Sequence, residues 1–194
     1  KTSLNTIFKQ KYLKKIMLQP SHIKILEALA TYKFLTYKQF LDIGVSSSAS
    51  YIREKAKELF KRKYIGQFDY GIHAELGRYP LVCYLLPKGQ KALLDFGWKE
   101  DDIRILKGRS GSNKYVNDYF HRRGVIDLHI SLVKQARLKG YKIEQFYTYF
   151  DKIGSVRKGN NLMSITSIPS GKTFLVADAI YILQKGGEHS LYCL

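Results

Sequence analysis

Residues 46–62 carry side chains that suit contact with double-stranded DNA. Projected onto a helix, the segment places apolar side chains on one face, namely Ala49, Ile52, Ala56, Leu59 and Phe60. The opposite face carries Ser47, Ser50, Glu54, Glu58 and Lys61, flanked by Tyr51 and Lys57, and Arg53 can also reach DNA. Serines let a helix approach the major groove closely, and lysine or arginine contacts phosphates and base edges. This face is therefore our candidate groove-facing surface.

Glu54 and Lys55 are two charged residues of this segment with further expected roles. Glu54 can accept a hydrogen bond from a cytosine amine, or it can pair with Lys57 or Lys61 on the same helix. Lys55 is expected to contact phosphates. A charged helix that is merely solvated is the competing interpretation for each residue.

The elements before this segment predict a helix-turn-helix. Ser21 is expected to cap a first helix that runs to Tyr32, and Thr36 to cap a second, shorter one. Gly44 suits the left-handed residue of a tight turn. Ser46 or Ser47 is then expected to cap the third helix, which runs to about Lys63.

The elements after the third helix predict a wing. Residues 64–69 and 81–86 are typical strands, and the polar stretch between them contains His73 and Arg78. A wing lies along the DNA backbone or minor groove, where arginine is favoured, so we expect both side chains to contact DNA. A helix with Pro87 in its first turn follows. Residues 20–98 are therefore predicted to be a winged helix-turn-helix domain.

The charge of the chain favours a polyanionic partner. Its 33 Lys and Arg exceed its 16 Asp and Glu, for a net charge of +17. The excess is spread over both halves, and no apolar run approaches the ~20 residues that span a bilayer. Nucleic acid is thus favoured over a membrane. No signal peptide is recognisable, and Cys83 and Cys193 are expected to be two buried thiols, so we expect a cytoplasmic protein.

The remaining sequence predicts a helix at the N-terminus and a second domain at the C-terminus. Residues 1–19 have the apolar spacing of an amphipathic helix, which could form a homodimer. Residues 99–116 are charged and rich in Gly and Ser, and are expected to be a linker. Within residues 117–194 we expect a helix over 117–139, a strand over 142–150, a long strand over 172–183 and a returning strand after KGGE. The predicted class is α+β, with a small α/β second domain.

The second domain resembles the core of restriction endonucleases, which hold Mg²⁺ with two carboxylates and use a lysine. Asp178 fits the first carboxylate of that pattern, but no Glu-x-Lys follows before Leu194, and Glu188 is a poor substitute. His121 and His129 share a helix face without further ligands at metal spacing. We therefore expect no cofactor and no metal, with Asp178 a metal ligand only if the protein is a nuclease.

The order of these segments resembles the replication–relaxation family, plasmid-encoded proteins of replication and mobilisation that include accessory proteins of relaxosomes. The stretches that carry the resemblance are LTYKQFLDIGVSSSASYIREKAKELFKRKYI, YLLPKGQKALL, HRRGVIDLHISLVKQA and LVADAIYIL. The resemblance implies binding to double-stranded DNA at a plasmid origin, beside a relaxase or a replication protein.

Two alternatives stay open at this point. The chain could be a winged-helix transcriptional regulator whose second domain dimerises or senses a ligand. It could also be a metal-dependent nuclease that is truncated before its last motif. The resemblance favours the accessory factor of mobilisation or replication.

Overall fold

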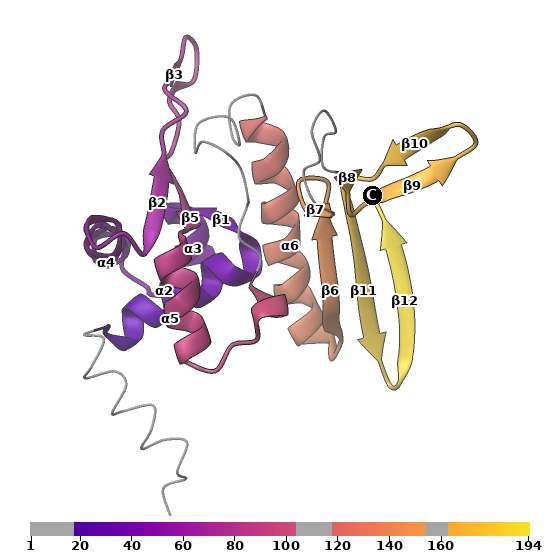
Figure 1. The fold of residues 1–194 in the computed structure, drawn as a ribbon, viewed down its shortest axis with the longest axis horizontal. Helices are drawn as coiled ribbons and strands as arrows, with labels where there is room; N and C mark the ends of the chain where they lie inside the picture. Colours follow the sequence, from indigo (N-terminus) through magenta and orange to yellow (C-terminus); the bar gives the residue numbers. More distant parts are fainter. Residues whose placement is uncertain (1–17, 104–117, 154–162) are drawn as a thin grey trace, which may run out of the picture. The chain divides into compact units, whose positions relative to one another are not determined.

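The computed structural model describes residues 18–103, 118–153 and 163–194 (Figure 1). Almost all of the expected N-terminal helix, and the linker from residue 104 on, lie outside these ranges. The chain divides into two compact units between Tyr119 and Phe120. Both combine helices with antiparallel sheets, so the protein is of mixed α+β class. Of the helices in the described ranges, none combines the length and apolar composition needed to cross a lipid bilayer.

The first unit packs four helices against a small antiparallel sheet. Its helices are α2 (Pro20–Tyr32), α3 (Tyr37–Ile43), α4 (Ala49–Lys61) and α5 (Pro87–Asp95), followed by the 3-10 helix η1 (Glu100–Asp102). Its central sheet has the order β1-β5-β2, formed by β1 (Phe34–Thr36), β5 (Val82–Leu85) and β2 (Ile65–Phe68). Between β2 and β5 the chain forms a hairpin with the short strands β3 (Ile72–His73) and β4 (Gly77–Arg78). This tip extends beyond the ends of β2 and β5 (Figure 1).

The core of the first unit comes from one apolar face of each helix. Its largest fully buried apolar side chains are Ile25, Leu26 and Leu29 of α2, Leu35 of β1, Phe40 of α3, Ile52 and Leu59 of α4, Ile65 of β2 and Leu93 of α5. Burial of this apolar area is the main stabilising term for such a unit. The predicted helices, the strands of the hairpin and the helix that begins at Pro87 are all present.

The helix ends confirm two sequence expectations and correct two others. Thr36 caps α3, because its side chain accepts a hydrogen bond from the Gln39 backbone at 3.3 Å. Gly44 ends α3 with φ of 85°. The expected caps at Ser21 and at Ser46 or Ser47 are wrong. Pro20 already starts α2, where its missing N–H is not needed, and Ser48 caps α4 by accepting from the Tyr51 backbone at 3.3 Å.

Lys63 ends the turn after α4 in a left-handed conformation, with φ of 59°. Its N–H donates to the carbonyl of Phe60 and the next N–H to that of Leu59, both at 2.9 Å. These bonds satisfy carbonyls that a helix end leaves without partners. They also turn the chain directly into β2.

The second unit combines one long helix with an antiparallel sheet. Helix α6 (Tyr119–Lys139) is followed by a sheet of order β12-β11-β6, formed by β6 (Lys142–Thr148), β11 (Ala179–Lys185) and β12 (Glu188–Cys193). Two further pairs are β7 (Lys152–Ile153) with β8 (Met163–Ser164), and β9 (Ser167–Ser170) with β10 (Thr173–Val176). The helix, the first strand and the Gly-containing hairpin before β12 agree with the sequence.

The long strand expected over residues 172–183 is in fact two strands. β10 pairs with β9, whereas β11 pairs with β6 and β12. The chain changes partners at Ala177 and Asp178, whose N–H groups donate to the carbonyls of Thr166 and Leu194. A continuous run of β-forming residues does not reveal such a change of partner.

The two cysteines differ in environment. Cys83 on β5 is fully buried as predicted, and burial raises the pKa of its thiol to about 12. Cys193 is exposed on β12, so the expectation that both thiols are buried is wrong for it. The reason is that β12 pairs with β11 on one side and, in the described ranges, with no strand on the other.

Candidate nucleic-acid interface

A row of basic side chains lies exposed along α4. Arg53, Lys57 and Lys61 are spaced four residues apart, so they lie on one face of the helix, with Ser50 near its start. All four are exposed. We call these four residues the basic face of α4. The helix is held in place from its opposite side by buried apolar side chains, which lie on the stripe predicted from the sequence.

The buried stripe of α4 differs from the prediction at two positions. Phe60 was expected to be buried but is 45% exposed, beside the basic face. Lys55 was expected to contact phosphates but is buried, with 7% of its surface exposed. Its ammonium lies 2.7 Å from a Glu58 carboxylate oxygen and 2.9 Å from one of Glu54. A lysine with two carboxylate partners is unsuited to a phosphate contact, and these partners raise its pKa above the ordinary value.

Glu58 links α4 to α2. Its second oxygen lies 2.9 Å from Nε2 of His22, which is almost fully buried on α2. The Nδ1 atom of His22 accepts a hydrogen bond from the Gln19 backbone at 3.1 Å, so the proton of the neutral ring lies on Nε2, toward Glu58. Burial lowers the pKa of His22, whereas the Lys55 hydrogen bond lowers that of Glu58. This polar contact joins α4 to α2, beside the buried apolar side chains.

The start of α4 presents hydroxyl groups to solvent. Ser47 is exposed in the segment before the helix. The hydroxyl of Ser50 lies 2.9 Å from that of Ser48, the capping residue. Tyr51 is also exposed, and the ammonium of Lys55 lies 5.5 Å from its ring centroid. Glu54 pairs with Lys55, rather than with Lys57 or Lys61 as the sequence suggested.

The hairpin tip uses its two predicted contact residues to hold its own shape. Arg78 forms a close ion pair with Asp69, which lowers the pKa of that carboxyl group. Nδ1 of His73 accepts hydrogen bonds from the backbones of Glu75 and Leu76 at 3.2 and 3.3 Å. Both side chains therefore stabilise the turn. Two large apolar side chains that the sequence did not single out are also exposed at this tip, Ile72 at 77% and Leu76 at 64%.

Comparison with known proteins assigns the chain to a family. A family model described as replication-relaxation matches residues 26–184, which is most of the chain. The chain belongs to the replication-relaxation family. Membership suggests a role in plasmid replication or mobilisation, as the sequence resemblance implied. No curated protein and no solved structure matches the chain in the same comparisons.

In this replication-relaxation protein the carboxylates considered for a nuclease site lie apart. Asp178 precedes β11, whereas Glu188 is opposite Lys185 at the far end of that strand. Asp178 instead lies 2.9 Å from Nε2 of His121 on α6. In the described ranges, no three or more His, Cys, Asp or Glu side chains are grouped as a metal site would require. His129, the other histidine considered, stacks on Phe146 with ring centroids 3.8 Å apart.

Proposed function

We propose that this replication-relaxation protein binds double-stranded DNA by placing α4 in the major groove. The observation that carries the proposal is the basic face of α4, which sets three exposed cations in line on a helix fixed by buried contacts on its other side. Phosphate contacts supply much of the affinity of DNA-binding proteins. The net charge of +17 adds a long-range attraction to the same partner.

The order of elements around α4 supports a winged helix-turn-helix. α3 ends at the left-handed Gly44, α4 follows, and the hairpin from β2 to β5 comes next. In that arrangement the start of the third helix meets base edges. Ser47, Ser50 and Tyr51 would then contact bases, and Arg53, Lys57 and Lys61 would contact phosphates. Glu54 would contact a base only after leaving Lys55.

The hairpin would act as the wing. Arg78 shares its charge with Asp69, and His73 is occupied by the turn, so their contribution to DNA binding would be smaller than that of α4. The exposed tip would lie along the neighbouring backbone or minor groove. We therefore expect most of the charged contacts with DNA to come from α4.

The biological role that we infer is that of an accessory factor in plasmid mobilisation or replication. Family membership supports this role. The DNA would be a plasmid origin, and the protein partner a relaxase or a replication protein. A homodimer would suit a palindromic or repeated site.

A footprint on plasmid origin DNA tests the proposal directly. We expect protection of a discrete site near the nick position, with a shift or extension of the footprint when the relaxase is added. The control is a scrambled duplex of the same length and base composition, measured at the same salt concentration because salt alone changes affinity. Equal protection of the scrambled duplex would show that the protein does not recognise a specific sequence. Protection confined to a promoter would assign the protein to transcriptional regulation instead.

A further inference from the structure

Four aromatic rings form a continuous row in the second unit. The ring of His129 on α6 lies 3.8 Å from that of Phe146 on β6, with an angle of 2° between their planes. Phe146 lies 5.7 Å from Tyr181 on β11, and Tyr181 lies 5.1 Å from Tyr192 on β12, at angles of 13° and 8°. Phe146, Tyr181 and Tyr192 are direct cross-strand partners. The row therefore runs across the whole sheet, with its rings nearly parallel.

The row ends at an open position. Tyr192 stacks on Tyr181 with one side of its ring, and its strand has no second neighbour in the described ranges. The side chain is accordingly 44% exposed. Strands are ~4.8 Å apart, which is close to the spacing of these rings, so the free side of Tyr192 offers the place of the next ring in the row. Tyr192 therefore keeps ring surface that Tyr181 does not cover, and Tyr192 also lines a pocket on the side of α6.

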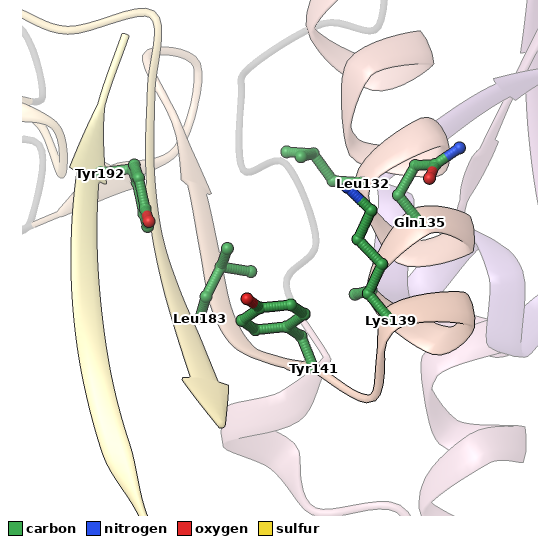
Figure 2. A pocket seen from close by; sticks show the side chains of 7 residues that line it. Leu132, Gln135, Lys139, Tyr141, Leu183 and Tyr192 are labelled. Carbon is green, nitrogen blue, oxygen red and sulfur yellow. The ribbon is translucent and has the colours of Figure 1, made fainter. Parts of the chain in front are cut away.

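A pocket lies beside Tyr192. It has a volume of about 250 Å³ and lies between α6 and the sheet (Figure 2). Its lining residues are Leu132, Gln135, Ala136, Lys139, Tyr141, Leu183 and Tyr192. Figure 2 shows Tyr192 and Leu183 on the strands and Leu132 and Lys139 on α6, with Tyr141 between them on the turn that joins α6 to β6. The volume is below the ~300–1,000 Å³ of pockets for drug-sized ligands, so a single ring system fits it better.

Positive charge accompanies the aromatic walls. Lys139 lines the pocket at the end of α6. The ammonium of Lys185, on the neighbouring β11, lies 4.6 Å from the ring centroid of Tyr141. Aromatic rings beside lysines are the combination with which proteins hold single-stranded nucleic acid, because the bases stack and the phosphates meet the cations.

We propose that this pocket binds one nucleotide, with its base against Tyr192, Tyr141 and Leu183 and its phosphate near Lys139. The nucleotide could belong to an unpaired DNA strand or be free in solution, since both present a planar base next to a phosphate. The site is separate from the basic face of α4, and it would add recognition of single strands to the duplex binding proposed above. An unpaired strand is what opening or nicking of a duplex supplies.

The test measures binding of a fluorescein-labelled single strand of about 12 nucleotides by anisotropy, a length within the usual range for one such module. Tyr192→Leu keeps an apolar side chain but removes the aromatic face. We expect its affinity for the single strand to fall about tenfold, as the loss of one contact between a base and an aromatic ring implies. The matched control is Tyr147→Leu, a tyrosine one position after Phe146 and therefore on the opposite face of the sheet.

A second pair of variants tests the phosphate contact. Lys139→Gln is expected to weaken binding of the single strand and to reduce its salt dependence, whereas Lys134→Gln, an exposed lysine of α6 outside the pocket, is expected to change neither. Duplex binding is measured with every variant. Duplex binding should be unchanged by Tyr192→Leu. The proposal for the pocket and the proposal for α4 can therefore be tested separately.

Two further measurements use the unaltered protein, so that a folding defect in a variant does not affect them. They also identify the source of the nucleotide. A single strand with 5-iodouracil, photo-crosslinked to the unaltered protein, should attach at Tyr192 or Tyr141. Competition by free deoxynucleoside monophosphates at concentrations that displace the strand would identify a free nucleotide as the ligand, and absence of competition would identify the strand.

Three results would overturn the proposal. They are crosslinks confined to the first unit, equal affinities of the Tyr192→Leu and Tyr147→Leu proteins for both ligands, and a dimer that dissociates on Tyr192→Leu. The last result would mean that a strand of a second copy occupies the open edge.

Discussion

Nε2 of His22 on α2 lies 2.9 Å from Oε2 of Glu58 on α4, inside the first unit. The same carboxylate accepts a hydrogen bond from Lys55 through its other oxygen. The contact between α2 and the helix proposed to bind DNA thus includes a neutral histidine and a shared carboxylate. Both groups have altered pKa values, so the arrangement is sensitive to pH.

We expect the first unit to lose stability as the pH falls below about 6.5. Burial lowers the pKa of His22 from 6.5, so below that pH the unfolded chain binds a proton that the folded protein does not. Stability therefore rises with pH in this window. Thermal unfolding from pH 5 to 7.5 should show a smaller pH dependence for His22→Gln than for the unaltered protein. His73→Gln serves as the control, and an equal change in both variants would contradict the role of His22.

Charge reversal on the basic face should weaken duplex binding at all sequences. Lys57→Glu or Lys61→Glu removes a phosphate contact, so the slope of log affinity against log salt should fall by about 1. Lys91→Glu on α5 changes the net charge by the same amount and is the control. Equal slopes for Lys57→Glu and Lys91→Glu in a salt titration would show that α4 does not contact the DNA. Replacing Ser50 or Tyr51 should instead alter the preferred sequence.

Gly89→Ala should destabilise the first unit. A Cβ atom at this position would overlap the backbone oxygen of Tyr64 and would lie 2.7 Å from Cδ1 of Leu85. Because a backbone atom cannot move aside easily, the cost is expected to be about 1–3 kcal/mol. Gly124→Ala on α6 is the comparison, since its Cβ would meet nothing within 4 Å and alanine favours a helix. Chemical denaturation should therefore show opposite signs for the two substitutions.

The two thiols should react at very different rates. Cys193 is exposed, whereas Cys83 is fully buried with a pKa near 12. A disulfide reagent at neutral pH should modify one thiol rapidly, and the second only after unfolding, because the thiolate is the reactive form. Cys193→Ser should abolish the rapid phase. Rapid loss of both thiols in the folded protein would contradict the burial of Cys83.

The sequence predicted the elements of the first unit better than those of the second. Apolar spacing with Thr36 and Gly44 predicted α3 and its turn, because capping and left-handed geometry depend on local residue types. Predictions from local residue types were wrong where contacts with other parts of the fold determine the environment of a side chain. Lys55 is buried because Glu58 and Glu54 pair with it.

The second unit shows the same limit over a longer distance. The break at Ala177 and Asp178 arises because β10 and β11 pair with different strands, which local propensity does not encode. The aromatic row was likewise invisible, since its rings come from four elements that are far apart in the sequence. Pairing register between distant strands is needed to bring them together.

At position 63 the first unit has a lysine, although glycine would adopt the backbone conformation there with less strain. Its left-handed backbone suits glycine, and a side chain there costs about 1 kcal/mol or more. The lysine continues a run with Lys61 and Arg62 at the C-terminal end of α4, where positive charge also interacts favourably with the helix dipole. At this position glycine would favour thermal stability, whereas lysine favours the positive electrostatic potential. Lys63→Gly should raise the melting temperature while lowering the affinity for polyanions, so an engineer cannot improve both properties there at once.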